Sequence, residues 1–240
     1  MRARLLLPSA ITDCDRRAIG LYHMRLRNRK EAGRLLAEKL TEYIGRRDVV
    51  VLSLPIGGVP VGSEIAHAIG ASLEPLLVRR LPVPGNEELE MGAISTGGAT
   101  VLDAEVISYL KISPAAVDMV IAREKVDLEK RWAAYCGPRR AQELSEKTAI
   151  LTDDGFASVW LLHSAVQVLR QLGARQIIIA APMMSRMVVD AVCPLVDRCV
   201  TLDTQTQFGD KASWYEDFIQ PADSEIRELL ARSVKSEPQI

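Results

Sequence analysis

The sequence predicts an α/β protein with a mostly parallel, twisted sheet that is flanked by helices and carries an inserted arm. Short apolar runs rich in β-branched residues alternate along the chain with segments of helical periodicity. Two of these runs, ending at Leu54 and Thr152, lead directly into glycine-containing turns that are followed by helical patterns. Strands that alternate with helices in this way form parallel sheets with helices on both faces.

Composition indicates an ordinary globular protein and excludes several classes. Of 240 residues, 48% are hydrophobic and 25% are charged, and no apolar run is long enough to span a membrane. The net charge of −1 provides no field that would attract nucleic acid or an anionic membrane, so neither partner is expected. The four cysteines are scattered without a C-x-x-C pair, which argues against zinc and disulfides and predicts reduced thiols in a cytoplasmic protein.

We expect one domain over residues 1–240. Within it, residues 1–24 form an irregular N-terminal arm, residues 81–146 an inserted loop or hairpin with a long helix, and residues 208–240 a C-terminal aromatic lid and helix.

In the first part of the chain, the elements follow from periodicity and from capping residues. Asn28 can cap the first helix, and Gly70 ends the second one. The expected elements are helix Arg29–Ile44, strand Asp48–Leu54, helix Val61–Ile69 and strand Leu73–Arg80.

In the second part, Pro114 opens a long helix because proline suits the first helical position. A strand precedes Asp153, and the remaining elements alternate as before. They are helices Pro114–Tyr135, Val159–Leu172, Met184–Val192 and Asp223–Val234, and strands Gln176–Ala180 and Arg198–Leu202.

The strongest candidate site is the sequence AILTDDGFA at residues 149–157. Asp153 and Asp154 follow a buried strand at the edge where open α/β sheets bind ligands. Carboxylates there can accept hydrogen bonds from hydroxyl groups or help to hold a hard cation, and the next helix start can bind a phosphate. The alternative is a structural turn in which Asp154 belongs to an N-terminal cap.

A second strand-to-helix turn, PIGGVP, contains Gly57 and Gly58. Paired glycines allow a ligand to approach the backbone, although a plain tight turn explains them as well. Arg79 and Arg80 end an expected strand and could meet phosphate oxygens, unless they are simply solvated.

Five blocks in one order carry a family resemblance. They are RNRKEAGRLLAEKL (27–40), LSLPIGGVPVGSEIA (52–66), LLVRRLPVPGNEELEMGAI (76–94), ILTDDGFAS (150–158) and WYEDFIQPADSEIRELL (214–230). Together they resemble a type I phosphoribosyltransferase, of the stand-alone bacterial group. The resemblance implies transfer of ribose 5-phosphate from phosphoribosyl pyrophosphate (PRPP) to a nucleobase-like acceptor, with Mg²⁺ brought by the substrate, and a homodimer.

The resemblance also implies residue roles. Asp153 and Asp154 would contact the ribose hydroxyls as catalytic residues, while no side chain is assigned as a direct metal ligand. The substrate-binding residues would be Gly57 and Gly58, which donate to the diphosphate, Arg79 or Arg80, which neutralises it, and Gly155, Ala157 and Ser158, which lie in the phosphate loop.

This phosphate loop is degenerate. The family pattern DDGxATGxT places glycine and a hydroxyl residue where this chain has Val159 and Leu161, with the bulky Trp160 between them, and Ile56 replaces an arginine. Losing one hydrogen bond to a charged phosphate costs about 1.5–3 kcal/mol. The alternatives are therefore a non-catalytic homologue that binds a nucleotide or phosphosugar or acts in regulation, and an interaction protein in which Trp160 fills the former pocket.

Overall fold

The computed structural model describes residues 25–206 and 209–234. The expected N-terminal arm (1–24) lies outside these residues, as do Phe208 and residues 235–240 of the expected C-terminal segment. Within the two described ranges, none of the helices has the length and apolar character that a membrane span requires.

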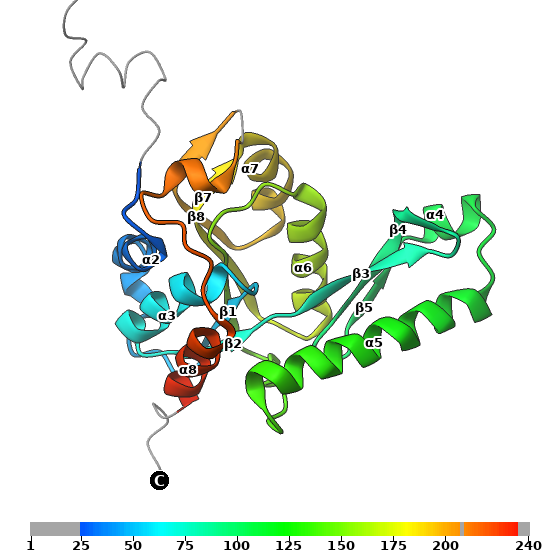
Figure 1. Cartoon of the computed structure of the whole chain (residues 1–240), viewed down its shortest axis with the longest axis horizontal. Helices are drawn as coiled ribbons and strands as arrows, with labels where there is room; N and C mark the ends of the chain where they lie inside the picture. Colours follow the sequence, from blue (N-terminus) through cyan, green and yellow to red (C-terminus); the bar gives the residue numbers. More distant parts are fainter. Residues whose placement is uncertain (1–24, 207–208, 235–240) are drawn as a thin grey trace, which may run out of the picture.

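The core of the fold is a five-stranded parallel sheet in the order β2-β1-β6-β7-β8. This arrangement confirms the predicted fold class, because every pair in the sheet is parallel and helices cover both faces (Figure 1). The strands are β1 (Val49–Ser53), β2 (Ser72–Pro75), β6 (Thr148–Thr152), β7 (Gln176–Ser185) and β8 (Arg198–Gln205).

Alternate residues of the central strands face opposite helical layers. Val49 and Val51 of β1 belong to an apolar cluster with the helices on one face, whereas Val50 and Leu52 belong to a second cluster on the other face. Both faces are thus buried, which explains the continuous apolar runs in the sequence. The first face is covered by α2 (Arg29–Glu38), α3 (Gly58–Ile69) and α8 (Asp223–Val234), and the second by α6 (Val159–Gln171) and α7 (Arg186–Val192).

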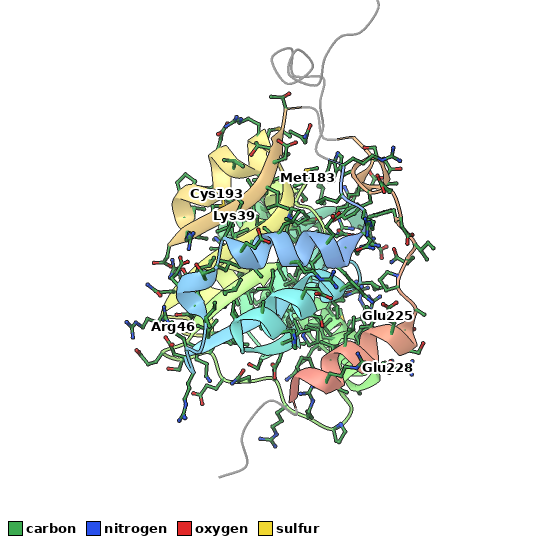
Figure 2. The ribbon with its side chains drawn as sticks, turned by 90° about the vertical axis from the view of Figure 1, so that its left-hand side faces the viewer. Lys39, Arg46, Met183, Cys193, Glu225 and Glu228 are labelled. Atoms are coloured by element: carbon green, nitrogen blue, oxygen red, sulfur yellow. A yellow bond between two sulfur atoms is a disulfide. The ribbon has the colours of Figure 1, made fainter. Side chains whose placement is uncertain are left out.

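Helix α3 lies very close to the sheet. Figure 2 looks onto this face and shows α2 beside α3, with α8 on the other side of α3. The closest approach is at Gly62, where an added Cβ would lie 2.0 Å from Ser53 Oγ and 2.9 Å from Leu73 Cδ1. At this position α3 therefore packs directly against β1 and β2.

Between β2 and β6 the chain forms a projection that we call the arm (residues 78–136; Figure 1). Its three strands form a separate antiparallel sheet, and α5 packs on that sheet through a third apolar cluster that includes Leu81, Met91 and Val120. The elements are β3 (Val78–Val83), β4 (Asn86–Ser95), β5 (Thr100–Leu102), α4 (Ala104–Tyr109) and α5 (Pro114–Cys136).

Several predicted boundaries were wrong. The first helix ends at Glu38 rather than Ile44, which is 58% exposed, and a short 3₁₀ turn (Thr41–Tyr43) follows it. The single strand expected over Leu73–Arg80 is two strands of different sheets, β2 and β3. Strand β7 continues through Met184, which was expected to open a helix. Apolar periodicity cannot separate such cases because a buried strand and a buried helix start look alike.

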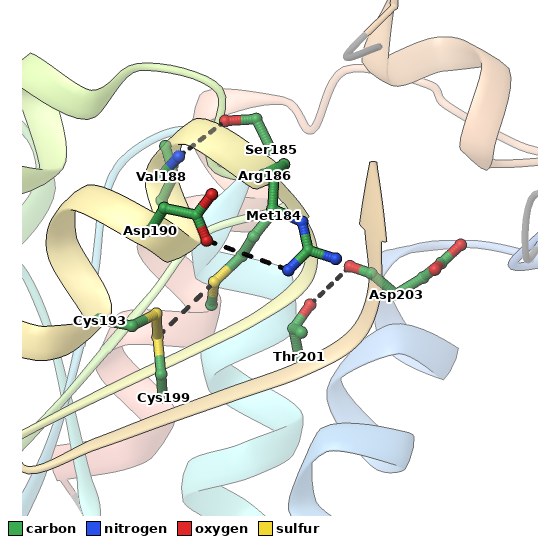
Figure 3. Close-up of a disulfide and its surroundings, with 9 residues drawn as sticks. All are labelled: Met184, Ser185, Arg186, Val188, Asp190, Cys193, Cys199, Thr201 and Asp203. Atoms are coloured by element: carbon green, nitrogen blue, oxygen red, sulfur yellow. Dashed lines mark hydrogen bonds and ion pairs between the residues drawn. A yellow bond between two sulfur atoms is a disulfide. The ribbon is translucent and has the colours of Figure 1, made fainter. Parts of the chain in front are cut away.

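The expectation of reduced thiols is wrong for one pair. Cys193 and Cys199 form a disulfide between the 3₁₀ turn after α7 (Cys193–Leu195) and β8 (Figure 3). Helix α7 returns the chain to the sheet edge and brings the two residues together, with Met184 Sδ 3.9 Å from Cys199 Sγ. Cys136 is a buried free thiol.

Replacing Gly62 with alanine tests the close packing of α3. We expect Gly62→Ala to lower the free energy of unfolding by about 1–3 kcal/mol, because overpacking outweighs the gain of about 1 kcal/mol in helix propensity. Urea titration measures the difference. Gly209→Ala is the control, since an added Cβ there has no atom within 4 Å; equal stabilities for the two variants would contradict the packing argument.

Candidate functional site

Two strand-to-helix turns meet at the carboxyl edge of the larger sheet. Strands β1 and β6 are hydrogen-bonded neighbours, and their last residues, Ser53 and Thr152, stand opposite each other. The Leu54 amide donates to the Thr152 carbonyl at 3.0 Å, which continues the ladder into the turns. Because the strands are parallel, the glycine turn and the acid turn lie side by side.

Gly57 and Gly58 permit this contact because they lack side chains. A Cβ on Gly57 would lie 2.0 Å from Asp154 Oδ2, and a Cβ on Gly58 would lie 2.9 Å from the Thr152 carbonyl oxygen. The Gly58 amide donates to the Leu54 carbonyl at 3.1 Å and is therefore already bonded. Gly57 thus admits the Asp154 carboxylate, and Gly58 admits the backbone of Thr152 and Asp153.

The two carboxylates are buried and are matched by two cations. The side chains of Asp153 and Asp154 are 13% and 5% exposed. Lys211 Nζ lies 3.1 Å from Asp153 Oδ2 and 2.6 Å from Asp154 Oδ1. On the other side of Asp154, Arg29 places Nε and Nη2 at 2.9 and 2.8 Å from Oδ2. Two negative groups thus face two positive groups, which is what burial of charge requires.

The segment 209–219, which we call the strap, holds these cations in position. Arg29 Nη1 donates to the Ile219 carbonyl at 2.9 Å, and its guanidinium lies 4.0 Å from the centre of the Phe218 ring. The Tyr215 hydroxyl donates to the backbone carbonyl of Asp154 at 2.9 Å. The strap therefore contacts both the acids and one of their counter-ions, with a cation–π contact in addition.

Titration behaviour follows from this burial. Loss of hydration and then the nearby Asp154 carboxylate raise the pKa of Asp153 to about 7, even though Lys211 acts in the opposite direction. Burial alone would lower the pKa of Lys211, but the two carboxylates outweigh it and hold that pKa above its usual value. Lys211 is therefore charged at neutral pH, where Asp153 changes its protonation state.

The loop after the acids is fixed by backbone contacts. Gly155 has φ +154°, and an added Cβ would lie 2.8 Å from Cζ3 of Trp214. The Phe156 amide donates to the Met183 carbonyl, and its carbonyl accepts from the Ser185 amide, both at 2.9 Å. The loop is thus tied to the end of β7 and covered by the strap.

Ser158 caps α6, because its Oγ accepts a hydrogen bond from the Leu161 amide at 3.2 Å. The alternative in which Asp154 forms this cap is wrong, since both Asp154 carboxylate oxygens bind cations. Ala157 and Ser158 are exposed, whereas Trp160 is partly buried. The indole that covers the loop at Gly155 belongs to Trp214 rather than to Trp160.

Arg79 and Arg80 lie in the arm, on β3, and not at the end of a strand of the larger sheet. Arg79 Nη2 is 2.7 Å from Glu124 Oε2, and Arg80 forms an ion pair with Glu90. Both guanidinium groups are thus paired with carboxylates of the arm. The structure does not bring them together with Asp153 and Asp154.

No protein-family model matches the sequence. Individual proteins and a solved structure are similar to it, however. Two proteins of Mycobacterium tuberculosis, from strains CDC 1551 / Oshkosh and H37Rv, are named "Putative phosphoribosyl transferase MT0597" and "Putative phosphoribosyl transferase Rv0571c". Each is 35% identical over 206 residues, covering 86% of this chain and 46% of the relative. The chain therefore spans about half the length of these curated relatives.

The crystal structure of TT1426 from Thermus thermophilus is similar along its whole length. It has a TM-score of 0.77 and 32% identity, and the match covers 87% of this chain and 99% of that one. The chain belongs to the type I phosphoribosyltransferase family. The family resemblance expected from the five sequence blocks is thus confirmed.

Within this phosphoribosyltransferase fold, sequence analysis missed two residues of the site. Arg29 stands next to the helix cap Asn28, and Lys211 lies within the aromatic segment expected to form a lid. The sequence did indicate that cations must be present near the acids, because two adjacent buried carboxylates require positive partners. The sequence has 30 lysines and arginines, however, and nothing in it marked these two.

We expect Arg29→Met to lower the free energy of unfolding by about 3 kcal/mol, because it leaves a buried carboxylate with one cation fewer. Lys30→Met is the matched control: Lys30 is exposed and lies 3.9 Å from Glu225, so about 0–1 kcal/mol is expected. Chemical denaturation of both variants measures the difference. Similar losses would show that Arg29 is not needed to balance the acid pair.

The raised pKa of Asp153 predicts a pH dependence. Between the reference pKa of 3.8 and the folded pKa of about 7, the folded protein binds more protons than the unfolded chain at this residue. The free energy of unfolding therefore falls as the pH rises from about 4 to about 7, because Asp153 ionises in the unfolded chain while it stays protonated in the folded protein. The loss is at most about 1.4 kcal/mol per pH unit.

Asp153→Asn should flatten the dependence of unfolding free energy on pH between about 4 and 7. Denaturant titrations at several pH values measure the slope. Glu228→Gln, an exposed carboxylate on α8, should keep the slope of the parent protein. If Asp153→Asn keeps that slope too, the carboxylate does not titrate in this range.

Proposed function

We propose that this phosphoribosyltransferase homologue transfers ribose 5-phosphate from PRPP to a nucleobase-like acceptor. The observation that supports the proposal is the pair Asp153 and Asp154 at the end of β6, next to the Gly57–Gly58 turn and ahead of the start of α6. In open α/β sheets this is the edge at which ligands bind.

In the proposed reaction, a nitrogen of the acceptor attacks C1 of the ribose. A C–N bond forms while the bond from C1 to the diphosphate oxygen breaks, and diphosphate leaves with the electron pair. The acceptor releases its proton to solvent. Positive charge develops on the ribose ring in the transition state, so nearby carboxylates stabilise it and correct positioning accounts for much of the rate.

Each part of the site has a role in this proposal. The Asp153 carboxylate, the more exposed of the pair, accepts a hydrogen bond from a ribose hydroxyl. The amides at the start of α6, next to the exposed Ala157 and Ser158, receive the 5-phosphate. The Gly57 amide would donate to the diphosphate.

Magnesium, which the family resemblance implies with the substrate, does not fit a position between the carboxylates as they stand here. Both Asp154 carboxylate oxygens contact cations, and Lys211 also contacts Asp153. Mg²⁺ needs near-octahedral oxygen coordination at about 2.0–2.1 Å, and two cations within hydrogen-bonding distance oppose it. No cluster of three or more His, Cys, Asp or Glu residues suited to a metal occurs in the described part of the chain.

The pairing of both acids with internal cations favours a second candidate function. In it, the protein binds a nucleotide or phosphosugar without transferring the ribose, in a regulatory role. A cytoplasmic location and a homodimer belong to the proposal as well. A disulfide such as Cys193–Cys199 is uncommon in a reducing cytoplasm, so a thiol count on freshly isolated protein bears on the location.

A pyrophosphate-release assay with PRPP, magnesium and a panel of nucleobases tests the transfer. We expect release that depends on one acceptor and falls by about a hundredfold or more in Asp153→Asn/Asp154→Asn, because the transition-state charge loses its stabilising groups. Glu228→Gln, which changes an exposed carboxylate on α8, is the control and should retain full activity.

The outcomes separate the two candidates. Equal rates for the parent protein and the double variant would show that the acids do not act in the reaction. If no base supports release while calorimetry detects binding of ribose 5-phosphate, transfer is ruled out and the binding function stands.

A further inference from the structure

The Lys211 ammonium lies between the two carboxylates. Its Nζ contacts one oxygen of each acid, at 3.1 and 2.6 Å, and its side chain is 30% exposed. An ammonium group has three donors, of which the acids use two. The acids therefore do not use the third donor, which can bind an anionic ligand.

Lys211 is held in this position by its neighbours in the strap. Asp210 accepts a hydrogen bond from the Ala212 amide at 3.0 Å and so caps the 3₁₀ turn that starts at Lys211 (Lys211–Trp214). At the end of this turn, the Leu26 amide donates to the Trp214 carbonyl at 2.8 Å, and the Trp214 ring lies against Gly155. The ammonium thus belongs to an anchored element rather than to a freely moving surface side chain.

A divalent cation at the acid pair would have to displace this lysine. Two positive groups cannot share the same carboxylate oxygens, because they repel each other strongly at short range in a partly buried site. Arg29 adds a further positive charge on the far oxygen of Asp154. The charges present therefore leave no net negative charge with which to attract a metal.

We propose that Lys211 is a built-in counter-cation that replaces a divalent metal at the Asp153–Asp154 pair, so that the site binds phosphorylated ribose without metal. This inference rests on the proposed function for the identity of the ligand. The lysine balances the acids in the free protein and offers its remaining donor to a phosphate of the ligand. In this proposal, Lys211 is thus the residue that makes the site independent of a divalent metal.

The first test measures ribose 5-phosphate binding by calorimetry at about pH 8, with EDTA or with excess Mg²⁺. The parent protein should show the same affinity in both conditions, within about twofold. Lys211→Met should bind at least about tenfold more weakly in EDTA, since a charge-assisted hydrogen bond is lost, and should regain affinity with Mg²⁺. Lys211→Arg should behave like the parent, and Lys130→Met, an exposed lysine on α5, is the matched control.

The second test measures metal binding without any ligand, by the electron paramagnetic resonance signal of Mn²⁺. The parent protein should not bind Mn²⁺ at the acid pair, whereas Lys211→Met should bind one ion. That ion should be lost again in Lys211→Met/Asp153→Asn/Asp154→Asn. Circular dichroism establishes that the variants are folded. If Lys211→Met does not fold, Lys211→Gln is used in its place.

The two tests distinguish failure of the Lys211 proposal from failure of the proposed transferase function. Ligand binding by the parent protein that requires Mg²⁺ would overturn it, and so would equal Mn²⁺ binding by the parent and Lys211→Met. If ribose 5-phosphate binds to no protein in either condition, the proposed function fails, but the Mn²⁺ comparison still decides whether Lys211 takes the place of the metal.

Discussion

Burial of two adjacent carboxylates is the constraint on which the rest of the site depends. An unpaired carboxylate away from water is too costly to persist, so each acid needs a cation and a full set of hydrogen bonds. Arg29 comes from the first described helix and Lys211 from the strap near the C-terminal end. Segments near the two ends of the described part of the chain are therefore joined through the acids that follow the central strand β6.

The glycines follow from the same constraint. The Asp154 carboxylate occupies the space where a side chain at Gly57 would stand, and Trp214 occupies the equivalent space at Gly155. One empty side-chain position admits the acid, and the other admits the aromatic ring that anchors the strap. Sequence patterns of this kind are usually attributed to ligand approach, but here the protein itself fills both spaces.

Much of this arrangement could be predicted from local sequence. The buried strands, the helices between them and the proximity of the two turns follow from periodicity and the parallel connection rule. The cap of α6 was assigned to the wrong residue, because Ser158 rather than Asp154 accepts the hydrogen bond from the Leu161 amide. The partners of the acids could not be predicted, because Arg29 and Lys211 approach from segments far away in the chain. The same limit applies to Arg79 and Arg80, whose strand joined the other sheet, and to Cys193 and Cys199, which meet only after α7 turns back.

The arm has its own apolar cluster and its own hydrogen-bonded sheet, in which none of the five parallel strands takes part. Substitutions inside that cluster share few partners with the acid pair, and effects of such separate positions usually add independently. Selection can therefore reshape the projecting surface of this protein, for instance to meet a new molecule, while the charge balance at the end of β6 is inherited unchanged.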